Sequence, residues 1–213
     1  MITHYCIQFS VYSGFFNAYS SLINQIYEPY GYSTDHCGFI GAVLIVVGLI
    51  GAAVLSPLID RTHAFIPAIR ILVPIIGLSY IAIIFTPVSP PNLAGAMIVC
   101  GFLGAAAFSL LPLSLEYSIE QTHPASPEIT STILWSGGQL LGGIFLVVMD
   151  AMRDEVGTGV RPKRNLWAAT VFEGVLATLV VPGAFLIKKR QSGKGRVEVD
   201  REAARAAAAA ASR

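Results

Sequence analysis

Charged residues are scarce in this sequence. They make up 13% of its 213 residues, whereas a typical soluble domain contains about 25%. Hydrophobic residues make up 54%, and the mean hydropathy is +0.65. This composition excludes an ordinary soluble domain and predicts a membrane protein. Eight of the fourteen Lys and Arg residues lie from Lys188 onward. The residues before Lys188 form no basic face suited to nucleic acid, so nucleic acid is not an expected partner.

The sequence also lacks the motifs of common enzymes and ATP-driven pumps. It contains no GxxxxGK[ST] nucleotide loop, no GxSxG elbow and no HExxH pair. Its three cysteines, Cys6, Cys37 and Cys100, form no CxxC pair, which argues against a metal site or a disulfide framework. We therefore expect neither an enzyme nor a protein that needs a cofactor.

Long apolar runs are present instead. A bilayer core needs roughly 20 apolar residues per helix. The sequence thus predicts an all-α membrane protein with six transmembrane helices in a half-domain over residues 1–187, followed by a basic, then Ala-rich cytoplasmic tail over 188–213. The predicted spans are about 7–27, 38–59, 67–87, 92–115, 130–151 and 166–187.

Basic residues predict the orientation. With six spans, both termini lie on one side, together with Arg61 and Arg70 and the eight basic residues of the tail. The opposite side holds Arg153 and the three basic residues of 161–164. The positive-inside rule then makes both termini cytoplasmic. The membrane itself is either the plasma membrane or that of an organelle.

The first predicted span carries a polar stripe. Its polar residues recur with the spacing of one helical face, and they are Ser10, Ser13, Asn17, Ser20, Ser21 and Asn24. Phe15 and Phe16 are expected to lie largely elsewhere. In lipid, such a face must look at other helices or at water. It therefore either forms interhelical hydrogen bonds within a bundle or lines a water-filled substrate path.

Two further spans contain unusual residues. The stretch "ILWSGGQLLGGIF" places Gln139 among four glycines, and Gly138 and Gly142 have the spacing that allows helices to approach closely. Glu173 is an acidic residue inside the sixth predicted span. It either has a functional role such as proton coupling or reaches the membrane interface, because it lies near the start of that span.

Three blocks carry a family resemblance: "SGFFNAYSSLINQ", "GLIGAAVLSPLIDRTHAF" and "LPLSLEYSIEQTHPASPEITSTILWSGGQLLGG". In order and spacing they resemble the seventh to twelfth helices of the feline leukaemia virus subgroup C receptor-related transporters, which belong to the major facilitator superfamily. The resemblance implies a secondary transporter with alternating access. It also implies a small polar or organic-cation solute, similar to choline or ethanolamine, or haem.

The resemblance also implies site residues. Gln139 matches a family glutamine that touches the substrate. Asn17 stands where the family has a tyrosine of an aromatic cage, which an amide cannot replace in recognising a quaternary ammonium group. Trp135 stands where the family tends to have an asparagine. It either returns an aromatic ring to the cavity or is a packing or lipid-facing tryptophan.

The resemblance covers only the second half of a twelve-span transporter. We expect a fragment of such a transporter, whose missing partner is an N-terminal six-helix half or a second copy. The alternative is a non-transporting structural or regulatory membrane subunit, or a truncated remnant. A small-molecule solute and the lipid bilayer are the other expected partners.

Two sets of site residues follow as hypotheses. The first and fifth spans are expected to line the substrate path through Ser13, Asn17, Ser20, Asn24, Trp135, Ser136 and Gln139. A cytoplasmic gate is expected where Arg61 meets one of two carboxylates spaced four residues apart. The gate residues are Asp60, Arg61, Glu116 and Glu120.

Overall fold

The computed structural model describes residues 2–62, 65–89, 91–122, 126–156 and 161–185. Its helices are α1 (Ile2–Tyr27), η1 (Glu28–Tyr30), α2 (Thr34–Thr62), α3 (Phe65–Ile83), α4 (Leu93–Thr122), α5 (Pro127–Ala151) and α6 (Trp167–Phe185). The described residues contain no β-strand, only an isolated bridge between Asp154 and Asn165. The prediction of an all-α membrane protein is confirmed. The predicted tail lies outside the described residues.

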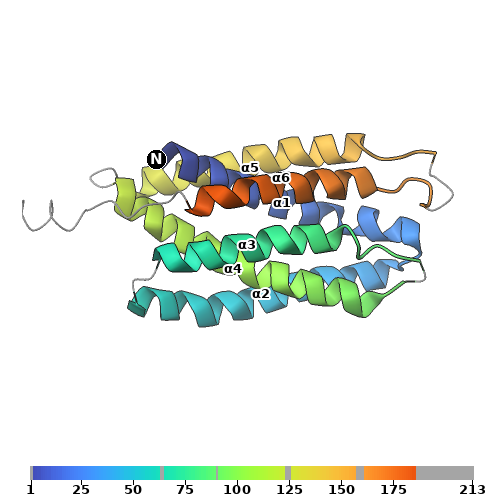
Figure 1. Cartoon of the computed structure of the whole chain (residues 1–213), viewed down its shortest axis with the longest axis horizontal. Helices are drawn as coiled ribbons and strands as arrows, with labels where there is room; N and C mark the ends of the chain where they lie inside the picture. Colours follow the sequence, from blue (N-terminus) through green and yellow to red (C-terminus); the bar gives the residue numbers. More distant parts are fainter. Residues whose placement is uncertain (1, 63–64, 90, 123–125, 157–160, 186–213) are drawn as a thin grey trace, which may run out of the picture.

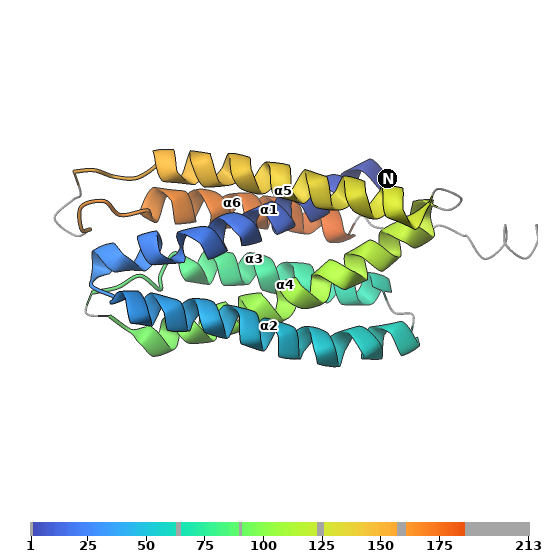
Figure 2. The same cartoon turned by 180° about the vertical axis from the view of Figure 1, so that it is seen from behind.

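The helices lie side by side along one long axis, and consecutive helices run in opposite directions (Figures 1 and 2). We call the end where α1 begins and α6 ends the N-terminal end, and the other the loop end. Helices α1, α5 and α6 form one layer, α2 and α4 form another, and α3 lies between them. This arrangement makes α1 a central helix that contacts α2, α4, α5 and α6.

Among the described helices, five are long and apolar enough to cross a membrane, namely α2 to α6. Helix α1 spans the first predicted range but falls outside this group, because its serine and asparagine stripe lowers its hydropathy. Other helices cover much of it: Phe15 and Tyr19 are fully buried. A helix enclosed by others can carry polar residues that a lipid-facing helix cannot.

Helix α3 ends at Ile83, whereas the sequence predicted a span that continues to about residue 87. The backbone N–H groups of Ile84, Phe85 and Thr86 each donate to the carbonyl three residues earlier. These shorter-range bonds tighten the chain and end the helix. The following prolines cannot donate to a helical carbonyl, so the helix does not resume there.

Glycines allow α2 and α4 to pack closely against each other. A β-carbon added at Gly51 would lie 2.9 Å from the Ala105 Cα atom. One added at Gly104 would collide with the Leu44 carbonyl group. Small residues therefore allow the two backbones to touch, as the spacing of small residues in these spans predicts.

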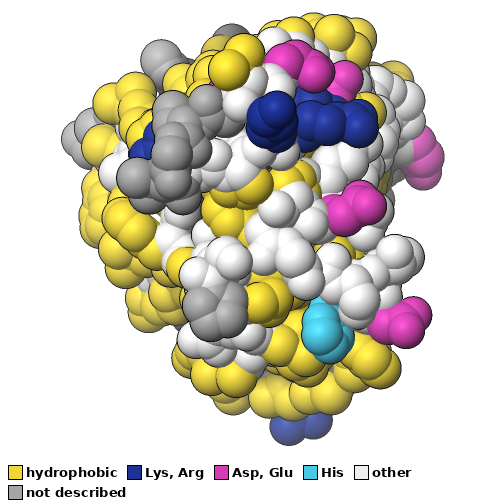
Figure 3. Space-filling view, turned by 90° about the vertical axis from the view of Figure 1, so that its right-hand side faces the viewer, with side chains coloured by type: hydrophobic (Ala, Val, Ile, Leu, Met, Phe, Trp, Pro, Cys, Tyr) yellow, Lys and Arg dark blue, Asp and Glu magenta, His cyan; other side chains and the backbone are white. Residues whose placement is uncertain are grey.

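Polar contacts stabilise the packing of α1, α5 and α6 at the loop end. The Arg153 guanidinium donates to both Gln25 of α1 and Asp150 of α5. The Arg161 guanidinium lies 3.4 Å from the ring centroid of Trp167, at the start of α6. Figure 3 looks onto this end, where charged side chains gather, while the rim formed by the helix sides is hydrophobic. Burial raises the pKa of the nearby Tyr30 phenol, and the charge of Arg161 offsets part of that rise.

Candidate functional site

The polar stripe of α1 packs against the glycines of α5. A β-carbon at Gly138 would lie 2.7 Å from the Ser13 hydroxyl oxygen, and one at Gly142 would lie 3.1 Å from the Asn17 Cβ atom. On the other helix, a β-carbon at Gly14 would lie 3.0 Å from the Gly142 nitrogen. This part of the stripe is therefore an interhelical contact. Close approach brings the α1 side chains next to Trp135 and Gln139 of α5.

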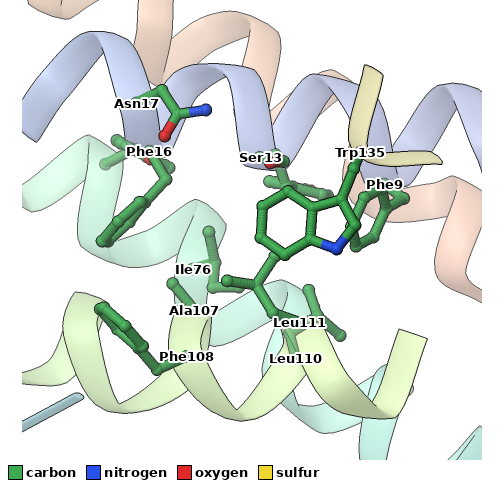
Figure 4. Close-up of a pocket in the computed structure, with 12 residues that line it drawn as sticks. Phe9, Ser13, Phe16, Asn17, Ile76, Ala107, Phe108, Leu110, Leu111 and Trp135 are labelled. Carbon is green, nitrogen blue, oxygen red and sulfur yellow. The ribbon is translucent and has the colours of Figure 1, made fainter. Parts of the chain in front are cut away.

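Beside this contact, α1, α3, α4 and α5 enclose a cavity of about 180 Å³ (Figure 4). Twelve residues line it: Phe9, Tyr12, Ser13, Phe16, Asn17, Ile76, Tyr80, Ala107, Phe108, Leu110, Leu111 and Trp135. None of these described residues carries a formal charge at neutral pH. The cavity is thus apolar and rich in aromatic side chains.

Aromatic pairs shape the cavity walls. Trp135 of α5 meets Phe9 of α1 edge to face, with ring centroids 6.4 Å apart and an interplanar angle of 87°. Phe16 of α1 meets Phe108 of α4 in the same way, at 5.3 Å and 89°. In Figure 4 the two pairs stand at opposite sides of the space between α1 and α4. Their ring faces and edges are available to a small guest.

An amide pair adjoins the cavity. The Asn17 Nδ2 atom donates to the Gln139 Oε1 atom at 3.3 Å, so the structure brings together two residues that the family resemblance singled out. Asn17 lines the cavity and is half-buried, while Gln139 is exposed beside it. The Ser13 side chain is buried, with 6% of its surface exposed. The amide pair therefore links the cavity to the outer surface of α5.

Three other predicted path residues, Ser20, Asn24 and Ser136, lie outside the cavity wall, as does Ser21 of the stripe. The Ser20 and Ser21 hydroxyls donate to the Asn17 carbonyl oxygen at 3.1 and 2.8 Å. The Asn24 Nδ2 atom donates to a Glu28 carboxylate oxygen at 3.3 Å. Ser136 is exposed on α5. Ser20 and Ser136 thus extend a polar surface from Gln139 rather than the cavity itself.

The predicted gate lies at the N-terminal end. Arg61 and Glu116 are both exposed there. The side chains of Asp60 and Glu120 fall outside the described residues. The gate stays a prediction, which charge reversal at Arg61 can test.

Sequence reasoning missed most aromatic residues of the cavity, among them Phe9, Tyr12, Phe16, Tyr80 and Phe108. The sequence placed Phe16 largely outside the polar stripe, and in the structure Phe16 and Asn17 line the same cavity. A signal was present: Phe9, Tyr12 and Phe16 follow the three- and four-residue spacing of one helical face. That face overlaps the one that carries Ser13.

This arrangement can recognise a small guest with a delocalised positive charge. Aromatic faces attract cations, with a free energy of about 2 kcal/mol when water is excluded. The cavity volume of about 180 Å³ is below the roughly 300–1,000 Å³ of drug-sized ligand sites. The amides of Asn17 and Gln139 can both donate and accept hydrogen bonds, so they suit a hydroxyl or amine at one end of such a guest.

Comparison with protein-family models gives no match. The chain is 30% identical over 139 residues to solute carrier family 49 member A3 of Danio rerio, across 65% of this chain and 29% of that protein. It is 26% identical over 153 residues to the choline/ethanolamine transporter FLVCR2 of Homo sapiens, across 71% and 29%. With the choline/ethanolamine transporter FLVCR1 of Mus musculus it shares 25% identity over 179 residues, across 82% and 31%.

The chain is a homologue of these transporters. They are members of the major facilitator superfamily, so the resemblance inferred from the three sequence blocks is confirmed. The matched region covers about 30% of each relative's length, as the shares of 29% and 31% show. The fold agrees with a half of such a transporter, and the protein is an integral, multi-pass membrane protein.

Proposed function

We propose that this chain forms one half of a twelve-span transporter that moves a small organic cation across a membrane by alternating access. The transporter homologues and the six-helix bundle support this proposal. In such transporters the substrate lies between two repeated halves near the middle of the membrane. A preceding six-helix segment or a second copy of this chain would supply the other half.

The aromatic cavity beside the Asn17–Gln139 hydrogen bond carries the proposal. Trp135 supplies the aromatic face that the amide of Asn17 cannot supply. A quaternary ammonium group has no hydrogen-bond donor, so its binding depends on such faces and on the exclusion of water. Choline therefore fits the cavity through its ammonium end, with its hydroxyl directed to the amide pair.

The same cavity favours choline over the other candidate solutes. Its volume of about 180 Å³ suits a small molecule better than the macrocycle of haem. Ethanolamine carries a primary ammonium group with three donors, whose full hydration is lost in an apolar cavity. Choline loses less on entering, because its methyl groups are weakly hydrated.

The exposed polar surface formed by Ser20, Ser136 and Gln139 supports a solute path. Polar side chains in the middle of spans need water or protein partners. We propose that the second half of the transporter covers this surface and encloses water with it. The N-terminal end is then the cytoplasmic side, as the distribution of basic residues predicts.

Equilibrium binding of radiolabelled choline to the purified chain tests the proposal. Replacing Gln139 by alanine removes the amide and is expected to weaken binding about fivefold, the effect of one hydrogen bond of about 1 kcal/mol. Leu140→Ala is the control, since Leu140 is 68% exposed on a neighbouring face of α5. It should leave the affinity unchanged.

Two results would count against this function. The first is the absence of saturable choline binding by a folded, monodisperse chain. The second is equal affinity for the unmodified chain and the Gln139→Ala variant. Either one would favour a structural or regulatory membrane subunit, in which the polar stripe of α1 serves packing alone.

A further inference from the structure

Helix α6 contains a buried carboxyl group for which the cavity alone gives no role. Glu173 has 0% of its surface exposed. Sequence reasoning allowed it to reach the membrane interface, but the surrounding helices prevent this. Neither of its carboxyl oxygens has a hydrogen-bond partner among the described residues. No described cation is therefore close enough to form a hydrogen-bonded ion pair with Glu173.

The packing around Glu173 leads directly to the cavity. A β-carbon at the adjacent Gly174 would lie 3.3 Å from the Tyr80 carbonyl oxygen, so α6 and α3 touch at this level. Tyr80 itself lines the cavity, so the helix that touches α6 beside Glu173 also forms part of the cavity wall. One turn further along α6, the Ala177 carbonyl accepts a hydrogen bond of 2.8 Å from the cavity-lining Tyr12.

The two tyrosines differ in their hydrogen bonding. The Tyr12 hydroxyl is engaged by Ala177, whereas the buried Tyr80 hydroxyl has no partner among the described residues. Tyr80 is therefore a cavity-lining residue whose hydroxyl is not engaged by any described group, and the same holds for the Glu173 carboxyl group. The unmatched hydroxyl and the unmatched carboxyl lie on two helices that contact each other, which makes this cluster a candidate site rather than ordinary packing.

Few other titratable groups face this part of α6. Helix α3 presents Tyr80 and, at the far end, Arg70, which donates to the Phe185 carbonyl. Phe185 lies twelve residues from Glu173, which is about 18 Å along a helix. Helix α1 presents Tyr12, and α5 presents the apolar ring of Phe145, which contacts Phe172. Burying a bare carboxylate in such surroundings costs several kcal/mol, and a protonated carboxyl avoids most of that cost.

We propose that Glu173 is a proton-binding site of the transport cycle, occupied in this conformation, and that Tyr80 links its proton to the cavity. The cation and the proton then compete. When a cation enters the cavity with water, the carboxyl O–H bond breaks. A water molecule that enters with the cation bridges the two groups: it accepts this proton and passes one of its own to the Tyr80 oxygen, while the original Tyr80 proton moves to a second water molecule. The carboxylate that remains is stabilised by the cation, and the proton returns when the cation leaves.

This inference rests on the proposed function and specifies its coupling as an exchange of one cation for one proton. Infrared spectroscopy of the purified chain in lipid tests it, because a protonated carboxyl group has a carbonyl stretch that a carboxylate lacks. We expect this band at neutral pH, its loss in Glu173→Gln, and its decrease as the pH is raised. Choline should decrease the band at constant pH and release about one proton per bound molecule.

Matched variants test whether the proton of Glu173 reaches the cavity through Tyr80. Tyr80→Phe should slow the loss of the band and the release of protons severalfold. Tyr27→Phe removes another buried tyrosine hydroxyl, one that is bonded to Thr86 outside the cavity, and should leave both unchanged. Glu173→Gln resembles the protonated side chain and is expected to fold. Glu173→Met, of similar volume, is a second variant should the amide not be tolerated.

The outcomes separate this inference from the proposed function. Absence of a band assigned to Glu173, or a band that responds to neither pH nor bound choline, would overturn the inference while choline binding stands. A chain that binds no choline but whose Glu173 band titrates and depends on Tyr80 would instead retain the proton site and overturn choline as the solute. Equal behaviour of Tyr80→Phe and Tyr27→Phe would overturn the role of Tyr80.

Discussion

Replacing Trp135 by leucine is expected to weaken choline binding about 5- to 30-fold. The indole ring lines the cavity and packs edge to face against Phe9. Leucine keeps much of the apolar contact but removes the aromatic face. The loss of roughly 1–2 kcal/mol of cation–π attraction corresponds to about 5- to 30-fold in affinity. A titration with radiolabelled choline on the purified variant measures this effect.

The chain offers a matched control for that experiment. Trp167, the second tryptophan of the sequence, lies at the start of α6 and contacts Arg161 rather than the cavity. Trp167→Leu should therefore leave choline affinity unchanged, and Trp135→Phe should retain part of it. If the two leucine variants bind choline equally well, Trp135 is a packing residue and the cavity is not the cation site.

The second large effect concerns the contact of α2 with α4. Gly104→Ala places a methyl group against the Leu44 carbonyl, and overpacking of this kind costs about 1–3 kcal/mol. We expect the melting temperature of the purified chain to fall by about 2–12 °C, since each 1 kcal/mol of this cost corresponds to roughly 2–4 °C at this chain length. Thermal unfolding followed by size-exclusion chromatography measures it.

Gly101→Ala is the control on the same helix. An added β-carbon there would meet Val43 and Val47 at 3.7 Å, which is an ordinary contact. Both substitutions raise helix propensity by about 1 kcal/mol, so a difference between them reports the interhelical contact. A melting temperature for Gly104→Ala equal to or above that of Gly101→Ala would contradict the close approach of α2 and α4.

Composition and periodicity were sufficient to predict the membrane class and the helical segments. Apolar runs bounded by proline and polar residues leave few alternatives in a bilayer. The end of α3 was placed too late, because short-range hydrogen bonds after Ile83 shorten an apolar run that could have stayed helical. The spacing of Gly138 and Gly142 correctly indicated close approach, although it could not name α1 as the partner helix.

The candidate site was only partly predictable. The stripe of α1 identified Ser13 and Asn17, and the resemblance identified Gln139 and raised Trp135 as an open question. The structure places Trp135 in the cavity wall. Tyr80 and Phe108 could not be found in advance, because helical spacing shows which residues share a face but not which helix that face meets. The burial of Glu173 depends likewise on how α1 and α3 cover α6.

The stripe of α1 has a packed part and an exposed part. Toward the N-terminal end, Ser10 and Ser13 pack against Gly137 and Gly138 of α5, as expected of helices that approach closely in a membrane. Toward the loop end, Ser20 and Ser21 are exposed. Asn17 lies at the change from one part to the other, where it also meets Gln139.

Cysteine accessibility at position 139 tests the central claim, a water-filled solute path along α1 and α5, most directly. The three native cysteines are replaced by alanine, and Gln139→Cys and Leu140→Cys are compared in membranes with a water-soluble maleimide. The account predicts rapid labelling at 139, slowed severalfold by choline, and little labelling at the lipid-facing position 140. Equal, choline-insensitive labelling at both positions, or none at 139, would contradict it.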